Sequence, residues 1–205
     1  LEPARLLDTW YVLVVDGTVQ EKCREGHAAG GKLARNAEGT SARYRYVLQI
    51  SLLGPGGLCL PFMHESIDMH DPKKETEKED CEIKAFQRLA KRLKAAFPKL
   101  PICLVGDALY AASTVVSTCE LNGWKYVFTL KDGRQPSLWD EVCTLVALAP
   151  HDRHRDQHRE PSGRTLLRDY IWVEALPLGE CTCAAILEGE ITPASATLYA
   201  WITNF

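Results

Sequence analysis

Between residues 80 and 148 helical patterns alternate with short apolar runs, and no other feature constrains the fold as strongly. Apolar residues at three-and-four spacing, together with end signals, predict helices over Asp80–Phe97, from about Ala111 to Asn122-Gly123, and from Pro136 to about Leu148. The runs Ile102–Val105 and Trp124–Leu130 predict buried strands between them. This alternation predicts an α/β domain with a mixed sheet.

Strands are predicted before this region. The run Tyr11–Val15 is typical of a strand buried on both faces. Residues 19–42 are polar and Gly-rich, so we expect a loop there. Arg43–Leu53 and Leu58–Ile67 predict two strands joined by the turn Gly54-Pro55-Gly56-Gly57. The first three strands should therefore form a meander.

After Pro150 the pattern is β only. Residues 151–163 are polar and rich in His and Arg, which favours a solvated loop. Three strands are predicted after it, over Thr165–Leu176, Cys181–Glu190 and Thr197–Phe205.

The composition of the chain is that of a globular protein. Its 205 residues are 46% hydrophobic and 25% charged, which excludes a collagen, a coiled coil and a disordered tail. The net charge of −3 does not indicate nucleic-acid binding, so such a function must depend on local sites. The sequence contains neither an apolar stretch long enough for a bilayer nor a signal-peptide pattern, so we expect no membrane partner.

The eight cysteines are scattered and form no Cys-x-x-Cys pair, which favours reduced thiols in the cytoplasm. Cys103 and Cys119 fall in apolar segments, where cysteine acts as a small hydrophobe. Cys181 and Cys183 should share one face of a strand, but no partner pair for a metal is evident.

Two aspartates occupy similar places in the predicted sheet. Asp16 and Asp107 each follow a short apolar strand and precede a small residue. If the two strands are parallel neighbours, the carboxylates meet at one sheet edge, where Mg²⁺ would offset their repulsion. A two-metal site of this kind stabilises both oxygens of an in-line displacement at phosphorus. The alternative is that each aspartate favours a turn or a cap.

Several segments resemble the catalytic domain of DDE-class insertion-sequence transposases. They are Tyr11–Thr18, Asp80–Phe86, Pro101–Tyr110 and Asn122–Tyr126. The resemblance implies a ribonuclease H-like, mixed five-stranded sheet flanked by helices, with Asp16 and Asp107 as catalytic and metal-binding residues. It also implies a catalytic core over residues 1–149 and a β-strand insertion over residues 150–205.

The function that follows from this resemblance is Mg²⁺- or Mn²⁺-dependent cleavage and strand transfer of DNA. The expected partners are double-stranded DNA, as transposon ends and target, and a second copy of the chain in a homodimer. The expected location is the bacterial cytoplasm, on the nucleoid when the protein is bound to DNA.

The family's third catalytic residue is a Glu on a helix after the β insertion, and this chain ends at Phe205 in what reads as the strand before that helix. We therefore expect the fragment to be catalytically incomplete. Glu141 is an alternative third carboxylate, since related enzymes without an insertion place theirs at about that distance from Asp107. A stand-alone nuclease using Glu141, and a non-catalytic remnant that binds DNA or a partner, remain open.

Other polar residues are candidates for binding phosphates or metal ions. Lys131 and Arg134 follow a predicted strand and are placed to meet substrate phosphates, although turn residues are often of these types. Lys84, Arg88 and Lys91 form one row on a predicted helix, which suits either phosphate contact or solvation. The remaining patterns are weak: His151, His154 and His158 as metal ligands, Cys23 with His27 as a metal knuckle, and Gly26–Leu33 as a phosphate loop.

Overall fold

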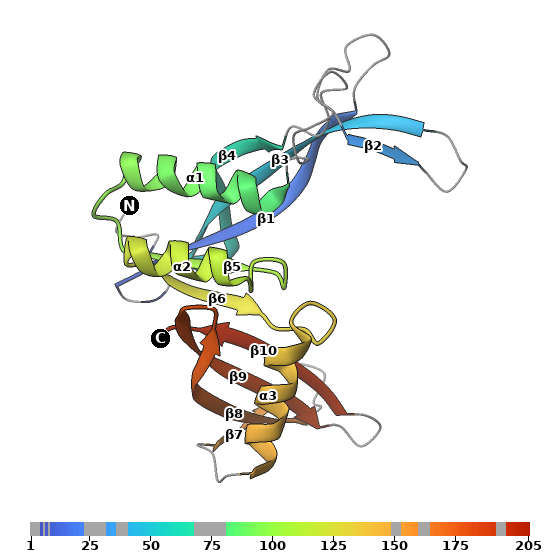
Figure 1. Ribbon diagram of the computed structural model, residues 1–205. Coiled ribbons are helices and arrows are strands. Elements are labelled where there is room, and N and C mark those ends of the chain that lie inside the picture. Colours follow the sequence, from blue (N-terminus) through green and yellow to red (C-terminus); the bar gives the residue numbers. More distant parts are fainter. Residues whose placement is uncertain are drawn as a thin grey trace. The chain divides into compact units, whose positions relative to one another are not determined.

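The computed structural model describes residues 5, 7, 9–22, 32–35, 41–67, 81–148, 153–159, 165–191 and 196–205. The chain forms two compact units, Leu1–Cys103 and Leu104–Phe205, and β5 (Ile102–Gly106) spans the boundary between them. Strands and helices both occur along the chain, so the α/β class is confirmed (Figure 1). No helix in the described ranges is long and apolar enough to span a membrane.

The first unit is an antiparallel arrangement of four strands with one helix. Its elements are β1 (Tyr11–Lys22), β2 (Lys32–Arg35), β3 (Ser41–Gly54), the 3-10 turn η2 (Pro55–Gly57), β4 (Leu58–Ile67) and α1 (Glu82–Ala96). Strand β3 pairs with β1 on one side, and with β2 and β4 along different parts of its length. The predicted meander of β1, β3 and β4 is confirmed, with β2 as an addition.

Helix α1 covers one face of this unit by means of an apolar stripe. Its buried residues are Ala85, Phe86, Leu89, Ala90 and Leu93. Gly17 of β1 lies under the start of the helix, where an added Cβ would come within 2.5 Å of the Glu82 side chain. The helix begins after Cys81, and the predicted capping residue Asp80 lies outside the described residues.

The second unit combines two helices with an antiparallel run of five strands. Its elements after β5 are α2 (Ser113–Asn122), β6 (Lys125–Thr129), α3 (Pro136–Leu148), β7 (Arg153–Arg159), β8 (Thr165–Leu178), β9 (Cys181–Ile191) and β10 (Ala196–Thr203). The strands pair in the order β6-β10-β9-β8-β7. Gly123 ends α2 with φ of 69°, a left-handed conformation that favours glycine.

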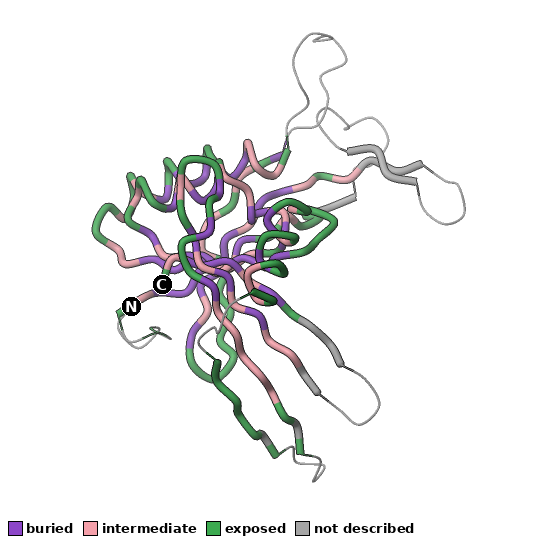
Figure 2. Tube along the Cα trace, turned by 60° about the horizontal axis from the view of Figure 1, so that its bottom comes forward, coloured by how far each residue is buried: buried purple, intermediate pink, exposed green. Residues whose placement is uncertain are grey.

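Aromatic residues fill the core of the second unit. Tyr110, Trp124, Tyr126 and Phe128 are buried, and the Tyr126 and Phe128 rings stack with centroids 5.1 Å apart. Figure 2 shows buried positions in purple along the packed strands and helices, while the turns that join them are mostly green. The side chain of Asn204 accepts a hydrogen bond from the Tyr126 N–H at 3.0 Å and donates one to the Trp124 carbonyl at 3.2 Å, which fixes the end of the chain to β6.

Three predictions about the strands are wrong. Five strands were expected in the sheet, but four pair in the first unit and five others pair in the second. The expected loop at residues 19–42 contains the end of β1, all of β2 and the start of β3. The expected loop at 151–163 contains β7. Both stretches are polar in sequence, so neither shows the apolar pattern of a core strand.

The finer fold assignment stays a prediction. Strand β10 pairs with β6, so the residues expected to form a β insertion continue the strand pairing of the second unit. The ribonuclease H-like fold and the functional division into residues 1–149 and 150–205 stay predictions from the resemblance.

Candidate functional site

Asp107 lies in a tight turn directly after β5, as the sequence predicted. Its Oδ1 accepts a hydrogen bond from the Leu109 N–H at 2.9 Å, and its carbonyl accepts one from the Tyr110 N–H at 3.1 Å. Asp107 itself is exposed, whereas Tyr110 is buried. The buried tyrosine therefore anchors a turn that presents the carboxylate to solvent.

Lys131 and Arg134 lie in a second exposed turn, between β6 and α3. The Lys131 carbonyl accepts hydrogen bonds from the N–H groups of Arg134 and Gln135, both at 3.1 Å. Gln135 Nε2 donates to the carbonyl of Ala111 at 2.8 Å. This bond ties the turn that carries the two cations to the loop that follows Asp107. One end of the second unit therefore presents a carboxylate together with two cationic side chains.

Gln135 has a positioning role that the sequence reasoning missed. Its side chain is half-buried and bridges two loops, whereas the predicted residues of the site are all exposed. A glutamine just before a helix that begins with proline gives no periodic signal. Only the fold, which brings residue 111 beside residue 135, reveals the contact.

Asp16 lies within a strand and not at its end, so the strand-end argument was wrong for this residue. Strand β1 continues to Lys22 because residues 16–22 pair with β3. Asp16 is directly opposite Gln49. Because Gly17 faces α1 and side chains alternate along a strand, Asp16 and Thr18 point to the face away from the helix.

That face of the first unit is hollowed around Asp16. A hollow of about 320 Å³ is lined by Val14, Asp16, Thr18, Gln49, Ser51, Leu53 and Cys59. Asp16 is exposed, and no hydrogen bond or ion pair is found for its carboxylate within the described part of the chain. The residue is therefore accessible to a ligand from solvent.

Asp16 belongs to the first unit and Asp107 to the second, so the metal site that they were predicted to share stays a prediction. Among the described residues there is no group of three or more His, Cys, Asp and Glu side chains arranged to hold a metal ion. Each aspartate is nevertheless an exposed oxygen donor. Mg²⁺ binds through one or two carboxylates and keeps several waters, so these donors fit the ion.

Glu141 is exposed on α3, the helix that contacts β8. Burial is the main cause that raises the pKa of the Cys183 thiol to about 11, and the negative charges of Glu120 and Glu141 add to it. The pKa of Cys181 is also raised, although its contact with Ser117 at 3.2 Å acts in the opposite direction. Among the described residues, these two thiols belong to no group of three or more His, Cys, Asp and Glu side chains arranged to hold a metal ion.

The predictions for the other cysteines and the histidines are confirmed only in part. Cys103 and Cys119 are buried, which confirms their interpretation as small hydrophobes. His154 is exposed on β7, with its ring centroid 6.3 Å from that of Tyr170. His151, Cys23, His27 and residues 26–31 lie outside the described residues.

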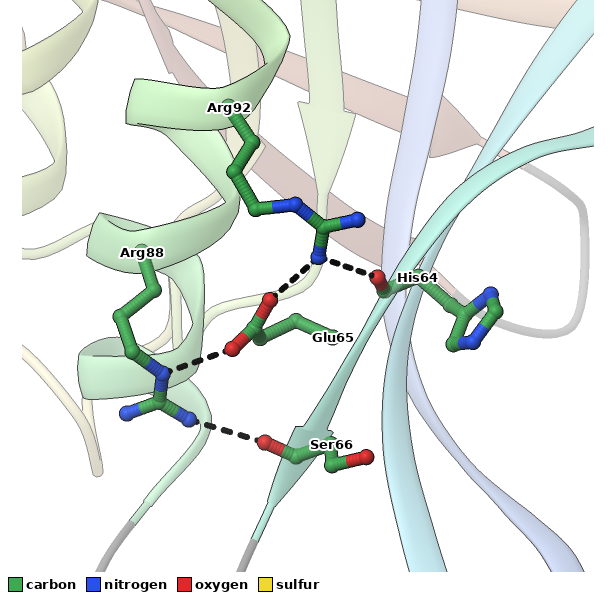
Figure 3. Close-up of polar contacts among 5 residues, drawn as sticks. All are labelled: His64, Glu65, Ser66, Arg88 and Arg92. Atoms are coloured by element: carbon green, nitrogen blue, oxygen red, sulfur yellow. Dashed lines mark hydrogen bonds and ion pairs between the residues drawn. The ribbon is translucent and has the colours of Figure 1, made fainter.

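One residue of the cationic row predicted on α1, Arg88, forms contacts with β4. Arg88 Nε donates to Glu65 Oε1 at 2.8 Å, and Arg92 donates to Glu65 Oε2 at 2.6 Å (Figure 3). The same two guanidinium groups donate to the carbonyls of Ser66 and His64 at 2.8 and 3.1 Å. Arg88 therefore joins the helix to β4. It is not available for the phosphate contact that was one interpretation of the row.

An aromatic face on the second unit was also missed. Strand pairing places Tyr170 and Tyr199 on either side of Glu188, and Trp172 and Trp201 on either side of Ile186. The Tyr199 and Trp201 rings stack with centroids 6.2 Å apart, and Tyr199 is exposed. The sequence contains two pairs of aromatic residues, Tyr170 with Trp172 and Tyr199 with Trp201. The members of each pair are two residues apart, which is the spacing of side chains on one face of a strand. This signal was overlooked because the partner strands were not known.

No protein-family model matches the chain, and no curated protein is similar to it.

Proposed function

We propose that the chain is the catalytic core of a DNA transposase of the DDE class, with a ribonuclease H-like core and a β insertion, which cuts and joins DNA strands with the help of Mg²⁺. The proposal starts from the sequence resemblance. The single structural observation that supports it is the hydrogen bond from Gln135 to the Ala111 carbonyl, which brings the Asp107 turn and the Lys131–Arg134 turn to one end of the second unit. Phosphoryl chemistry on DNA needs a carboxylate that binds a metal ion. It also needs positively charged side chains beside it that bind the phosphates.

The roles of the residues follow from their exposure and charge. Asp16 and Asp107 would hold Mg²⁺, which, when bound, neutralises charge on the phosphate and makes a bound water more acidic. Lys131 and Arg134 bind phosphate oxygens of the DNA backbone and so fix the register of the strand. The hydrogen bond from Gln135 to Ala111 holds the turn and so fixes the backbone from which the two cations reach the substrate.

The aromatic face of the second unit favours a nucleic acid over a small phosphate ester as the substrate. Bases of an opened strand stack on Tyr and Trp side chains, and each such contact contributes about 1–3 kcal/mol. Tyr199 and Trp201 form a stacked pair on that face. We propose double-stranded DNA as the partner, a homodimer as the working assembly and the bacterial cytoplasm as the location.

DNA binding by the cation-bearing turn can be measured directly. The double variant Lys131→Ala/Arg134→Ala should bind a 30-base-pair duplex more weakly than the unchanged chain. The slope of log affinity against log salt should decrease by about 2, because each lost phosphate contact removes about 0.9. The matched control is Lys99→Ala/Arg159→Ala, which removes two exposed cations that lie outside both this turn and the row on α1.

An unchanged slope in the Lys131 and Arg134 variant would overturn the assigned role of these residues. Nicking of DNA with Mg²⁺ tests the alternatives on the same samples. Nicking that is lost in Glu141→Gln would favour the stand-alone nuclease. DNA binding without nicking, unchanged by Asp16→Asn or Asp107→Asn, would favour the non-catalytic remnant.

A further inference from the structure

The hollow on the open face of the first unit contains more than the predicted aspartate. Pairing between strands sets Asp16 of β1, Gln49 of β3 and His64 of β4 in one row across the unit. Directly opposed residues of antiparallel strands have Cβ atoms about 5 Å apart, so the Asp16 and Gln49 side chains are neighbours. Figure 3 shows the His64 side chain pointing away from Arg88 and Arg92, which is the side that this row occupies.

The amide of Gln49 is held in one orientation. Its Nε2 donates to Ser51 Oγ at 2.9 Å, and Ser51 is buried. With the nitrogen engaged in this bond, the amide oxygen is the acceptor that Gln49 can offer to a ligand in the hollow. Gln49 is half-buried and lines the hollow, so its side chain is partly shielded from bulk water.

The donors around the hollow define the class of ligand. The carboxylate of Asp16, the amide oxygen of Gln49 and the hydroxyl groups of Thr18 and Ser51 are all oxygen donors. Such donors suit a hard cation that keeps part of its water shell, as Mg²⁺ does. Cys59 also lines the hollow, and its thiol would instead favour a softer ion such as Zn²⁺.

We propose that Gln49 is a positioning residue for hydrated Mg²⁺ at Asp16, with its amide oxygen accepting a hydrogen bond from a water of the ion. This inference rests on the proposed function, because it takes Asp16 as a metal ligand. Partners that hold the ligands or waters of an ion commonly contribute 10- to 100-fold to its affinity. Gln49 thereby restricts where the ion, and the phosphate that it meets, can lie.

Cys59 offers a readout that does not depend on catalysis. Its exposed thiol lines the same hollow, so an ion at Asp16 should slow its alkylation by N-ethylmaleimide. Cys143 is exposed on α3 and serves as the internal reference in the same peptide digest. We expect Mg²⁺ to slow alkylation of Cys59 several-fold and to leave Cys143 unchanged, with Asp16→Asn abolishing the effect.

The Gln49 variants decide the inference. Gln49→Leu should raise the Mg²⁺ concentration that gives half protection by about tenfold, and Gln49→Glu should lower it by adding a carboxylate. Ser51→Ala, which frees the amide, should have an intermediate effect. Thermal melting in the absence of metal verifies that each variant is folded, and Gln49→Glu keeps the test valid if Gln49→Leu is unstable.

The outcomes separate this inference from the proposed function. Protection that requires Asp16 but is the same in Gln49→Leu and Gln49→Glu overturns the role of Gln49 and leaves Asp16 as a metal ligand. Protection by Zn²⁺ and not by Mg²⁺ overturns the proposed ion, as does the absence of protection by either. If Mg²⁺ protection depends on Gln49 while the chain neither binds nor nicks DNA, the proposed function fails and the ion site stands.

Discussion

Each unit has a strand at the edge of its sheet, and arginines protect the two edges in different ways. At β4 the arginines come from α1, where Arg88 and Arg92 donate to Glu65 and to two carbonyls of the strand. At β7 the arginine belongs to the edge strand itself, and Arg155 pairs with Asp169 of β8 at 2.5 and 2.8 Å.

The difference shows that edge protection can come from the tertiary fold or from the strand's own sequence. Unpaired groups of an edge strand invite pairing with another chain. At β4 a helix covers these groups, and the side chain of Glu65 is only 16% exposed. The described residues 153–157 of β7 are all exposed and mostly charged, so charge alone discourages pairing there.

The largest effect is expected when the β4 edge is uncovered. Arg88→Ala/Arg92→Ala leaves the half-buried Glu65 carboxylate without its two partners and exposes the carbonyls of the strand. We expect a loss of about 2 kcal/mol in the free energy of unfolding, because an unsatisfied polar group costs about 1–3 kcal/mol. The arginines are 43% and 56% exposed, and screening by solvent keeps the loss below that of a fully buried pair.

Urea unfolding measures this loss. Gln87→Ala/Lys91→Ala, which changes two exposed residues of the same helix, is the matched control and should shift the midpoint little. Equal shifts in the two double variants would show that the contact between α1 and β4 depends on the apolar stripe alone.

A smaller, pH-dependent effect is expected from Glu65→Gln. Partial burial would raise the pKa of Glu65, but hydrogen bonds from Arg88 and Arg92 outweigh it and lower the pKa below its ordinary value of 4.5. A carboxylate with a lowered pKa adds stability above pH 4.5, and this stability is lost as the pH falls through the lower folded-state pKa. We expect the variant to be about 1 kcal/mol less stable at pH 7. Urea unfolding at pH 7 and pH 3 should show that the difference becomes smaller in acid, and a difference independent of pH would contradict the assignment.

The smallest effect is expected at β7. The hydrogen bond with Arg155 lowers the pKa of Asp169, but both groups are open to solvent. Arg155→Ala should leave the urea midpoint unchanged at 150 mM salt, since exposed ion pairs add little to stability. A shift as large as that of Glu65→Gln would show that the pair on the strand and the pairs under the helix are equivalent, which would remove the contrast between the two edges.

The sequence predicted the regular elements well where apolar residues repeat. The bounds of β4 and α3 agree with the predicted Leu58–Ile67 and Pro136–Leu148, and Gly123 ends α2 as expected. The prediction failed for β2 and β7, because neither Lys32–Arg35 nor Arg153–Arg159 shows the apolar alternation of a buried strand. Charge-rich segments were consequently interpreted as loops.

The candidate site was predicted in part. Asp107 lies after its strand as expected, because a turn that uses the aspartate side chain is encoded within a few residues. The location of Asp16 within β1 was missed, since the length of a strand depends on the partner that it pairs with. The role of Arg88 was missed for the same reason, as Glu65 is distant in the sequence.

The sequence by itself determined the helices, the turns and the place of Asp107 after its strand, because periodicity, caps and side-chain turns act over a few neighbouring residues. The tertiary structure alone decided that Gln49 lies opposite Asp16, that Gln135 holds the loop after Asp107, and that Arg88 covers the β4 edge. These contacts join residues that are far apart in the chain. They form only when burial of the apolar faces has fixed which strands and helices are neighbours.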